Sequence, residues 1–339
     1  IGHSENVIIR NCSFHDIQKW HFIEINSSRN VTIDNCRFYN YGVENADYTE
    51  MIQFDYMSDQ SVFPWFGPYD HTPCVNMRVT NCTFTGTTDR INERAPAGIG
   101  NHTTGNQSVI KGIFIENCIF ENLGCGIKFV VGSDITINTN YFNKCNGGVY
   151  AGGNIKNINV INNNLIGLSN YGESYARRGV FTEMLNHLTY VTVTGNTIME
   201  FGDSGMTVQG IYTNIVSNHV NNNGRHGIYA GWGDFGSKIS ENIAWGNNKV
   251  NVSGQTMYDF NFNLRRYNLE STQQIGDHVI TNNKFSSCKL NAVTGDISNI
   301  QKSYFVSNFI KNTLEVDAST NGLIVFGSNW KNWAPITLP

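Results

Sequence analysis

A short pattern recurs along the chain: alternating apolar residues, then an Asn with Cys or another Asn beside it, then Phe or another apolar residue. Its first copies are VIIRNCSF, VTIDNCRF and MRVTNCTF. With the Asn position as a marker, the copies fall at Asn11, Asn35, Asn81, Asn117, Thr139, Asn162, Gly195, Ser217, Glu241, Asn282 and Ser307. Six of the ten intervals are 22 to 25 residues long, and the longer ones contain insertions. A fixed period of this length predicts a solenoid.

The apolar residues of each copy alternate with polar ones, which is typical of strands and not of helical repeats. The frame of leucine-rich repeats is absent. We therefore expect an all-β protein, a parallel β-helix of about 11–12 coils. It would form one domain over residues 1–330, followed by a tail at 331–339. The chain opens in strand-like sequence without an initiator Met, and we expect it to be a fragment that lacks an N-terminal part.

The marker column and the cysteines beside it have a physical explanation. Equivalent turn positions in such a solenoid lie about 4.8 Å apart, so their amides can bond from coil to coil. Cys12, Cys36, Cys82 and Cys118 share the next repeat position, which later coils fill with Asn. Because Cys is a small residue that prefers burial, we expect a buried, reduced stack, with a disulfide ladder as the alternative.

Composition excludes two classes of partner. A net charge of −4 and a pI near 6.1 give no basic footprint for nucleic acid. No run of 18 apolar residues is present, so we expect no membrane span. We find no metal-ligand spacing and no cofactor motif, since the Gly-rich AGGN at 151–154 is not followed by a helix.

The first strand of each coil can be aligned upstream of its marker. An inward column then comprises Ile23, Ile52, Ile99, Ile127, Val149, Val180, Met206 and Ile228. Since successive strand residues face opposite sides, the following residues form an outward column: Glu24, Gln53, Gly100, Lys128, Tyr150, Phe181, Thr207 and Tyr229. A second outward column contains Asn26, Asp55, His102 and Val130, with Glu183 and Gln209 nearby further along. The early coils thus gather acids, an amide, an imidazole and a Lys on one face.

Two insertions lie beside these coils, at residues 56–73 and 85–97. They contribute Trp65, Asp70 and Arg94, and Trp232 adds an aromatic residue close to Tyr229. Long loops on one side of a rigid scaffold are where solenoids place binding sites. We therefore predict a binding cleft on this face, with an aromatic wall that suits stacking on sugar faces.

The coil period, the Asn column and blocks such as HFIEINSSRNVTIDNCRF, EMIQFD and AGIGNHT resemble the pectin lyase-like right-handed parallel β-helix family over essentially the whole chain. Within it they look like the phage- and Gram-positive-associated proteins, including tailspikes, that depolymerise extracellular polysaccharide. The resemblance implies an extracellular or virion-associated protein acting on a bacterial surface or capsular glycan, and a homotrimer if it is phage-derived. The Asp set and paired Arg of pectate lyases and the adjacent Asp pair of polygalacturonases are absent.

Our first hypothesis is glycoside hydrolysis by two carboxylates. Glu24 and Asp55 should lie one rung apart with backbones about 8 Å from each other, which suits an inverting enzyme. Asp70 is the alternative acid, and His102 orients Asp55 or acts as a base. Gln53 would orient the substrate. The other candidate sugar-binding residues are Lys128, Tyr150, Glu183, Arg94, Trp65, Tyr229 and Trp232.

Two alternatives remain open. A lyase acting on a uronic-acid glycan would need a base and cations, which Lys128 with His102, or Arg94, could supply. A glycan-binding appendage without turnover would keep the aromatics and tolerate loss of the acids. His21 and Glu50 share a repeat position and could simply pair with each other. Arg177 and Arg178 could bind an anionic sugar or lie in a solvated turn.

Overall fold

The computed structural model describes residues 1–42, 49–59, 67–87, 96–103, 105, 108–171, 175–183, 189–232, 235–250, 256–265, 276–292, 300–320, 322–332 and 334–335. In these ranges the chain consists mainly of short parallel strands and turns, with 3-10 helices only at η2 (Tyr175–Arg177) and η3 (Ala318–Thr320). The chain divides into two compact units, unit 1 (Ile1–Leu168) and unit 2 (Ser169–Pro339). The prediction of a parallel β-helix is confirmed, whereas a single domain over 1–330 stays a prediction.

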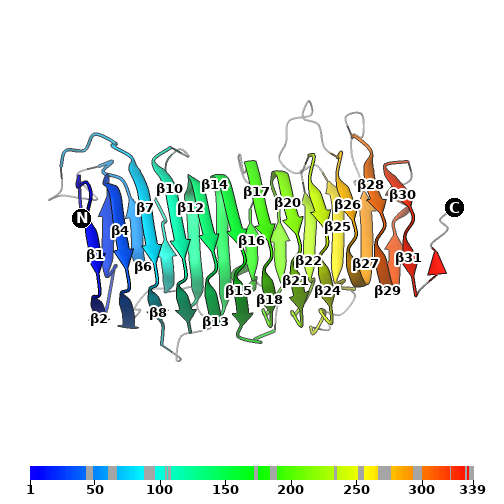
Figure 1. The fold of residues 1–339 in the computed structure, drawn as a ribbon, viewed down its shortest axis with the longest axis horizontal. Helices are drawn as coiled ribbons and strands as arrows, with labels where there is room; N and C mark the ends of the chain where they lie inside the picture. The colour runs from blue at the N-terminus through cyan, green and yellow to red at the C-terminus, as the bar shows by residue number, and fades with distance from the viewer. Residues whose placement is uncertain are drawn as a thin grey trace. The chain divides into compact units, whose positions relative to one another are not determined.

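Unit 1 is a stack of coils in which successive strands join three parallel sheets, named A, B and C here (Figure 1). Sheet A contains β3 (Ile23–Asn26), β6 (Glu50–Asp55), β9 (Ala97–Gly100) and the first parts of β12 (Cys125–Asn138) and β14 (Gly147–Ile161). Sheet B contains β1 (Ile8–Arg10), β4 (Arg29–Asp34), β7 (Cys74–Thr80), β10 (Ile110–Glu116) and the second parts of β12 and β14. Sheet C contains β2 (Ser13–Ile17), β5 (Arg37–Tyr41), β8 (Thr83–Thr85), β11 (Ile119–Glu121), β13 (Tyr141–Cys145) and β15 (Asn164–Gly167).

Unit 2 repeats this arrangement. Its sheet A contains β16 (Val180–Thr182), β19 (Met206–Val208), β22 (Ile228–Trp232), β25 (Phe260–Arg265) and the ends of β27 (Lys284–Ala292) and β29 (Phe309–Val316). Its sheet B contains β17 (Thr189–Thr194), β20 (Ile211–Val216), β23 (Lys238–Ser240), β26 (Val279–Thr281), β28 (Ser303–Val306) and β30 (Ile324–Gly327). Its sheet C contains β18 (Thr197–Met199), β21 (His219–Asn221), β24 (Ile243–Trp245), the starts of β27 and β29, and β31 (Trp330–Lys331), which pairs antiparallel with β32 (Ala334–Pro335).

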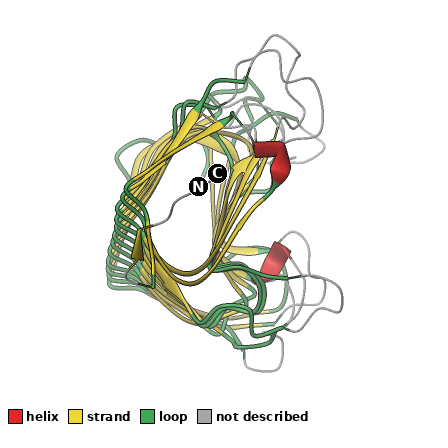
Figure 2. Ribbon diagram, turned by 90° about the vertical axis from the view of Figure 1, so that its right-hand side faces the viewer, coloured by secondary structure: helices red, strands yellow, loops and turns green. Residues whose placement is uncertain are grey.

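The marker residues form the turn between sheets B and C. Each has a positive φ, between 51° at Asn35 and 69° at Gly195. Asn accepts this left-handed conformation more readily than other residues with a side chain, which explains its frequency there. In each unit, the turns between successive strands repeat from coil to coil and appear in green in Figure 2.

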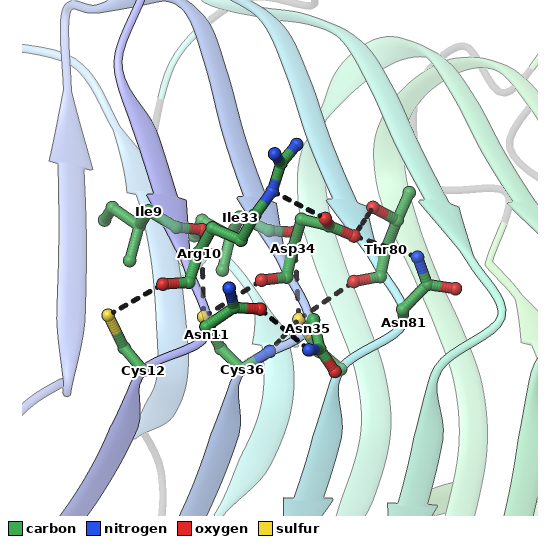
Figure 3. A network of polar contacts seen from close by, with 11 residues as sticks. Ile9, Arg10, Asn11, Cys12, Ile33, Asp34, Asn35, Cys36, Thr80 and Asn81 are labelled. Carbon is green, nitrogen blue, oxygen red and sulfur yellow. Dashed lines mark hydrogen bonds and ion pairs between the residues drawn. The ribbon is translucent and has the colours of Figure 1, made fainter.

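The residue after each marker carries the buried polar ladder. In unit 2, Asn218 donates its backbone N–H and its Nδ2 to Asn242 Oδ1, both at 3.0 Å, and Asn242 bonds Asn283 in the same way. We expected the amide bonds at the marker column itself, where the structure has Asn35 donating to Asn11 Oδ1 at 2.8 Å at the surface (Figure 3). The continuous buried ladder of unit 2 lies one residue later.

Cysteines replace asparagine in the ladder of the early coils. Cys36, Cys82 and Cys118 are buried and Cys12 is half-buried, and all four have free thiols. Figure 3 shows Cys12 and Cys36. The Cys36 backbone N–H donates to Cys82 Sγ at 3.4 Å, and the Cys118 N–H donates to Asn140 Oδ1 at 2.9 Å. The sulfur therefore takes the place of the amide oxygen, as expected of a buried, reduced stack.

Stacked aromatic rings fill the core side of sheet C in unit 1. Phe14, Phe38, Phe84, Phe120 and Phe142 form a continuous column with ring centroids 4.7 to 5.0 Å apart. Their spacing follows the distance between neighbouring strands, so each coil places its ring on the previous one. Burying one such side chain stabilises the fold by about 2–3 kcal/mol.

Candidate functional site

The register of sheet A in unit 1 confirms the alignment of its outward column. Glu24 pairs with Gln53, Gln53 with Gly100, Gly100 with Lys128, and Lys128 with Tyr150. In the second column Asn26 pairs with Asp55. His102 follows β9 by two residues, and its ring returns over the same face, as its contacts with β6 show.

Asp55 is buried, with only 6% of its surface exposed, although it belongs to the outward column. Its Oδ1 accepts the Tyr56 N–H at 2.7 Å, and the side chain of Thr103 also bonds it. Burial raises the pKa of the Asp55 carboxyl, and these two bonds and His102 oppose the rise. A carboxyl with a raised pKa holds its proton to higher pH and can act as a general acid.

Glu50 is completely buried and pairs with His102. Its Oε2 lies 2.9 Å from His102 Nδ1, while its Oε1 makes no hydrogen bond to any described residue. The expected pairing of Glu50 with His21 is also present, because the His21 Nδ1 donates to the Glu50 backbone carbonyl at 2.7 Å and lies 3.9 Å from Oε2. Burial lowers the pKa of His21, which keeps that ring neutral. Glu50 was missed as a site residue, because its repeat position suggested only a pairing at the strand start.

Gln53 connects the imidazole to the acid. Its Nε2 donates to Asp55 Oδ2 at 3.2 Å and lies 3.4 Å from His102 Nε2. An amide nitrogen has only protons to offer, so His102 Nε2 accepts and its proton resides on Nδ1, towards Glu50. His102 therefore presents a basic Nε2 on the sheet face, with 27% of its side chain exposed.

Glu24 and Asn26 lie on the neighbouring rung. Asn26 Nδ2 donates to Glu24 Oε1 at 3.1 Å, and Glu24 is half-buried. Asn26 is buried, and its Oδ1 has no hydrogen-bond partner among the described residues. The negative charge of Glu24 contributes to the raised pKa of Asp55. Asn26 is a polar group of this site to which we had given no role.

Gly100 separates Gln53 from Lys128 in the outward column. A Cβ at Gly100 would lie 1.9 Å from the Lys128 carbonyl oxygen, so the backbones are too close there for any side chain. The column therefore has a position without a side chain between an amide and a cation. Lys128 and Tyr150 beyond it are both half-buried.

The remaining predicted site residues are Asp70, Trp65, Arg94, Glu183, Tyr229 and Trp232. Asp70 is half-exposed, accepts the Thr72 N–H at 3.0 Å and lies 4.0 Å from His3, and the Thr72 bond lowers its pKa, which disfavours a role as an acid near neutral pH. Trp65 and Arg94 fall outside the described residues. Glu183, Tyr229 and Trp232 belong to unit 2, and the Trp232 side chain is not described.

Tyr229 belongs to a separate polar group on sheet A of unit 2. Its ring stacks on His226 at 5.2 Å, and burial lowers the pKa of His226 to about 4, which suits the structural role expected for that residue. Arg178 lies with its Nε 3.5 Å from the buried Asp203 and its guanidinium 4.4 Å from the Phe181 ring centre. Arg178 is thus held by an ion pair and a ring rather than solvated in a turn.

The described ranges contain no group of three or more His, Cys, Asp or Glu residues arranged to hold a metal ion. They also contain no helix long and apolar enough to cross a membrane.

No family model matches the chain. Among solved structures it is similar to a mannuronic acid-specific polysaccharide family 6 lyase from the human gut microbiota, with a TM-score of 0.56, 12% identity, and coverage of 96% of this chain and 80% of that one. The fold is a parallel β-helix (Figure 2). This likeness concerns the fold alone, since the sequences have diverged.

A relative by sequence is the plasmin and fibronectin-binding protein A of Streptococcus pneumoniae, strain ATCC BAA-255 / R6. The two are 33% identical over 155 residues, which is 42% of this chain and 21% of the relative. The matched region therefore spans about a fifth of that protein. A structure of this pneumococcal surface adhesin aligns with 97% of the chain and 65% of its own length, at 17% identity and a TM-score of 0.37.

Proposed function

We propose that unit 1 cleaves an extracellular polysaccharide containing uronic acid, with His102 as general base and Asp55 as general acid. The observation that carries this proposal is the arrangement of Glu50, His102, Gln53 and Asp55. One imidazole nitrogen is held by a buried carboxylate, the other is basic, and a single amide contacts both that nitrogen and a carboxyl with a raised pKa.

The reaction that uses this pair most directly is β-elimination. His102 Nε2 takes the proton from C5 of the uronate, and the electrons of that C–H bond form the C4–C5 double bond. The C4–O bond breaks, and Asp55 gives its proton to the departing glycosidic oxygen. Lys128, across the gap at Gly100, supplies a positive charge for the uronate carboxylate, which becomes more electron-rich as C5 loses its proton. Proton exchange between the two residues and water restores the starting state.

Hydrolysis is the second candidate, and the register of Glu24 and Asp55 on neighbouring rungs supports it. There Glu24 would activate water while Asp55 protonates the leaving group. The sequence match to a pneumococcal protein named for binding plasmin and fibronectin supports a third candidate, a binding surface without turnover. An extracellular or virion location, a homotrimer and sugar contacts by Tyr150, Glu183, Tyr229, Trp232, Trp65 and Arg94 stay predictions, as does a role for Asp70.

The test is incubation with a panel of uronate-containing bacterial polysaccharides, measuring both new reducing ends and the ultraviolet absorbance of an unsaturated uronate. We expect both signals together, and their loss in His102→Ala and Asp55→Asn. Glu24→Gln separates the two reactions, because hydrolysis needs this carboxylate and elimination does not. Asp134→Asn, an exposed acid on sheet B, is the matched control.

Reducing ends without the absorbance change, lost in Glu24→Gln, would replace elimination by hydrolysis. Binding of the polysaccharide without either product would favour the third candidate, a binding surface without turnover. Full activity in Asp55→Asn would remove Asp55 from the mechanism.

A further inference from the structure

A second left-handed position lies at or near the start of the sheet B strands. Pairing of the strands aligns this position in twelve described coils, and its residue has positive φ in ten of them; Lys302 and Leu323, in the last two coils, are the exceptions. Eight of the ten are Asn, Asp or Gly, which tolerate this conformation: Asn6, Asn30, Asn76, Gly112, Asp134, Asn157, Gly236 and Asp277. The other two, in adjacent coils of unit 2, are Tyr190 and Tyr212, with φ of 60° and 58°.

A bulky residue at positive φ is a true outlier, because its Cβ crowds the following carbonyl. Such strain persists where the surroundings enforce it, and it concentrates at functional positions. The chain's usual solution at this turn is an amide, as where Asn30 donates to Asn6 Oδ1 at 3.0 Å. Two adjacent exceptions therefore need an explanation beyond the turn itself.

Burial in the core does not offset the backbone strain of the two tyrosines, because both side chains are exposed. Tyr190 is 53% exposed and Tyr212 is 42% exposed. They lie opposite each other on the neighbouring strands β17 and β20 (Figure 1), with ring centroids 5.3 Å apart and planes inclined by 14°. Tyr212 also meets the edge of Phe235 at 6.0 Å and covers Gly236, where a Cβ would lie 3.2 Å from its ring. The stack is thus supported on one side, while Tyr190 is its more exposed member.

We propose that Tyr190 and Tyr212 form a carbohydrate-stacking surface on unit 2 that holds a polysaccharide chain without cleaving it. Among the described residues, the rings contact each other, Phe235 and Gly236, which are all uncharged and favour the C–H face of a pyranose ring over a charged ligand. Two rings one strand spacing apart can contact successive parts of one polymer. The tyrosine hydroxyls can hydrogen-bond to sugar hydroxyls. Phe235 and Gly236 keep the stack fixed before a ligand arrives, which reduces the ordering cost of binding.

The decisive variant is Tyr190→Asn/Tyr212→Asn, which installs the residue that other coils use at this turn. If the tyrosines serve a ligand, the variant loses binding and its thermal unfolding midpoint is equal to or above that of the wild type, because the strain is relieved. Tyr304→Asn is the matched control: Tyr304 lies on β28 of the same sheet, is also 42% exposed and has no positive φ.

Binding is measured as retardation in native gels containing alginate, polygalacturonate, hyaluronan or dextran. We expect the wild type and Tyr304→Asn to be retarded equally in at least one gel, and the double variant to bind at least tenfold more weakly. The readout is retention rather than cleavage, so it does not depend on the reaction of unit 1, and His102→Ala tests that reaction separately.

Four results would overturn the proposal. These are no retardation of the wild type in any gel, equal retardation of the double variant, a lower unfolding midpoint in that variant, or a changed oligomeric state in sedimentation. The third would assign the tyrosines to stability, and the fourth would assign them to contacts between copies of the chain.

Discussion

Asn242 provides a quantitative test of the buried ladder. It is fully buried, accepts two bonds from Asn218, and donates to Ile215 O at 2.8 Å, Ser240 O at 3.0 Å and Asn283 Oδ1 at 2.9 Å. Asn242→Ala removes all five bonds but keeps the backbone bond from residue 242 to Asn283. The Asn218 side chain keeps two carbonyl partners, so the main loss is the hydrogen bond of the Asn218 backbone N–H, which is left without an acceptor.

An orphaned buried N–H costs about 1–3 kcal/mol, and each carbonyl that loses a donor costs about 1 kcal/mol. We therefore expect Asn242→Ala to lower the free energy of unfolding by about 3–5 kcal/mol. Asn242→Cys should cost only about 1–2 kcal/mol, because a thiol can reproduce the contacts of Cys82. That residue accepts the Cys36 N–H and donates to Ile33 O and Thr80 O, the carbonyls equivalent to Ile215 O and Ser240 O.

Urea unfolding followed by circular dichroism measures these differences. Asn214→Ala, at an exposed site on β20, is the control and should change stability by less than about 0.5 kcal/mol. The reasoning fails if Asn242→Ala costs under about 1 kcal/mol. It fails equally if Cys proves as costly as Ala, because then sulfur does not substitute for the amide oxygen.

Four further predictions concern the site and the turns. Glu50→Gln should slow cleavage at least about tenfold, because a neutral amide holds the His102 Nδ1–H less strongly than the buried carboxylate does; an unchanged rate would contradict this role. Because the pKa of Asp55 is raised, the cleavage rate should fall as pH rises through that pKa. The stability that this raised pKa contributes is present below the unfolded pKa of about 3.9 and is lost as pH rises through the folded pKa. The wild type should therefore lose stability relative to Asp55→Asn between these two pKa values. Glu241→Asn should stabilise by about 0.5–1 kcal/mol in urea unfolding, because Glu241 has a φ of 60°, and a loss would refute the strain argument. Gly100→Ala should destabilise by about 3 kcal/mol through the collision with Lys128, and unchanged stability would show that the strands can separate.

The repeat predicted the fold and the sheet A register because both depend on local rules. A period of two sets which side chains face inward, and an Asn at a fixed spacing sets where the chain turns. Those rules placed Glu24 beside Gln53 and Asn26 beside Asp55, as the structure has them. They apply wherever the chain is in a strand.

Alternation and Asn spacing do not predict side-chain positions beyond the ends of the strands. His102 lies two residues beyond β9, so alternation does not determine the direction of its ring, and its pairing with Glu50 joins residues 52 apart in sequence. Asp55 ends β6, and its carboxylate is bonded by Tyr56 and Thr103, which lie beyond the strands where alternation does not apply. At Tyr190 and Tyr212 the left-handed backbone conformation favours Asn, Asp or Gly, so the tyrosines in the sequence did not indicate a left-handed position there.

The buried Asn ladder also favours one order of coil formation during synthesis. The backbone N–H of Asn196, Asn218, Asn242, Asn283 and Asn308 donates in each case to an amide oxygen supplied by the following coil. When a coil leaves the ribosome, this backbone N–H therefore lacks its partner until the next coil emerges and accepts the hydrogen bond. Because synthesis delivers the coils in that same order, each new coil completes its predecessor, and growth from the N-terminal side leaves one unsatisfied rung at the advancing end.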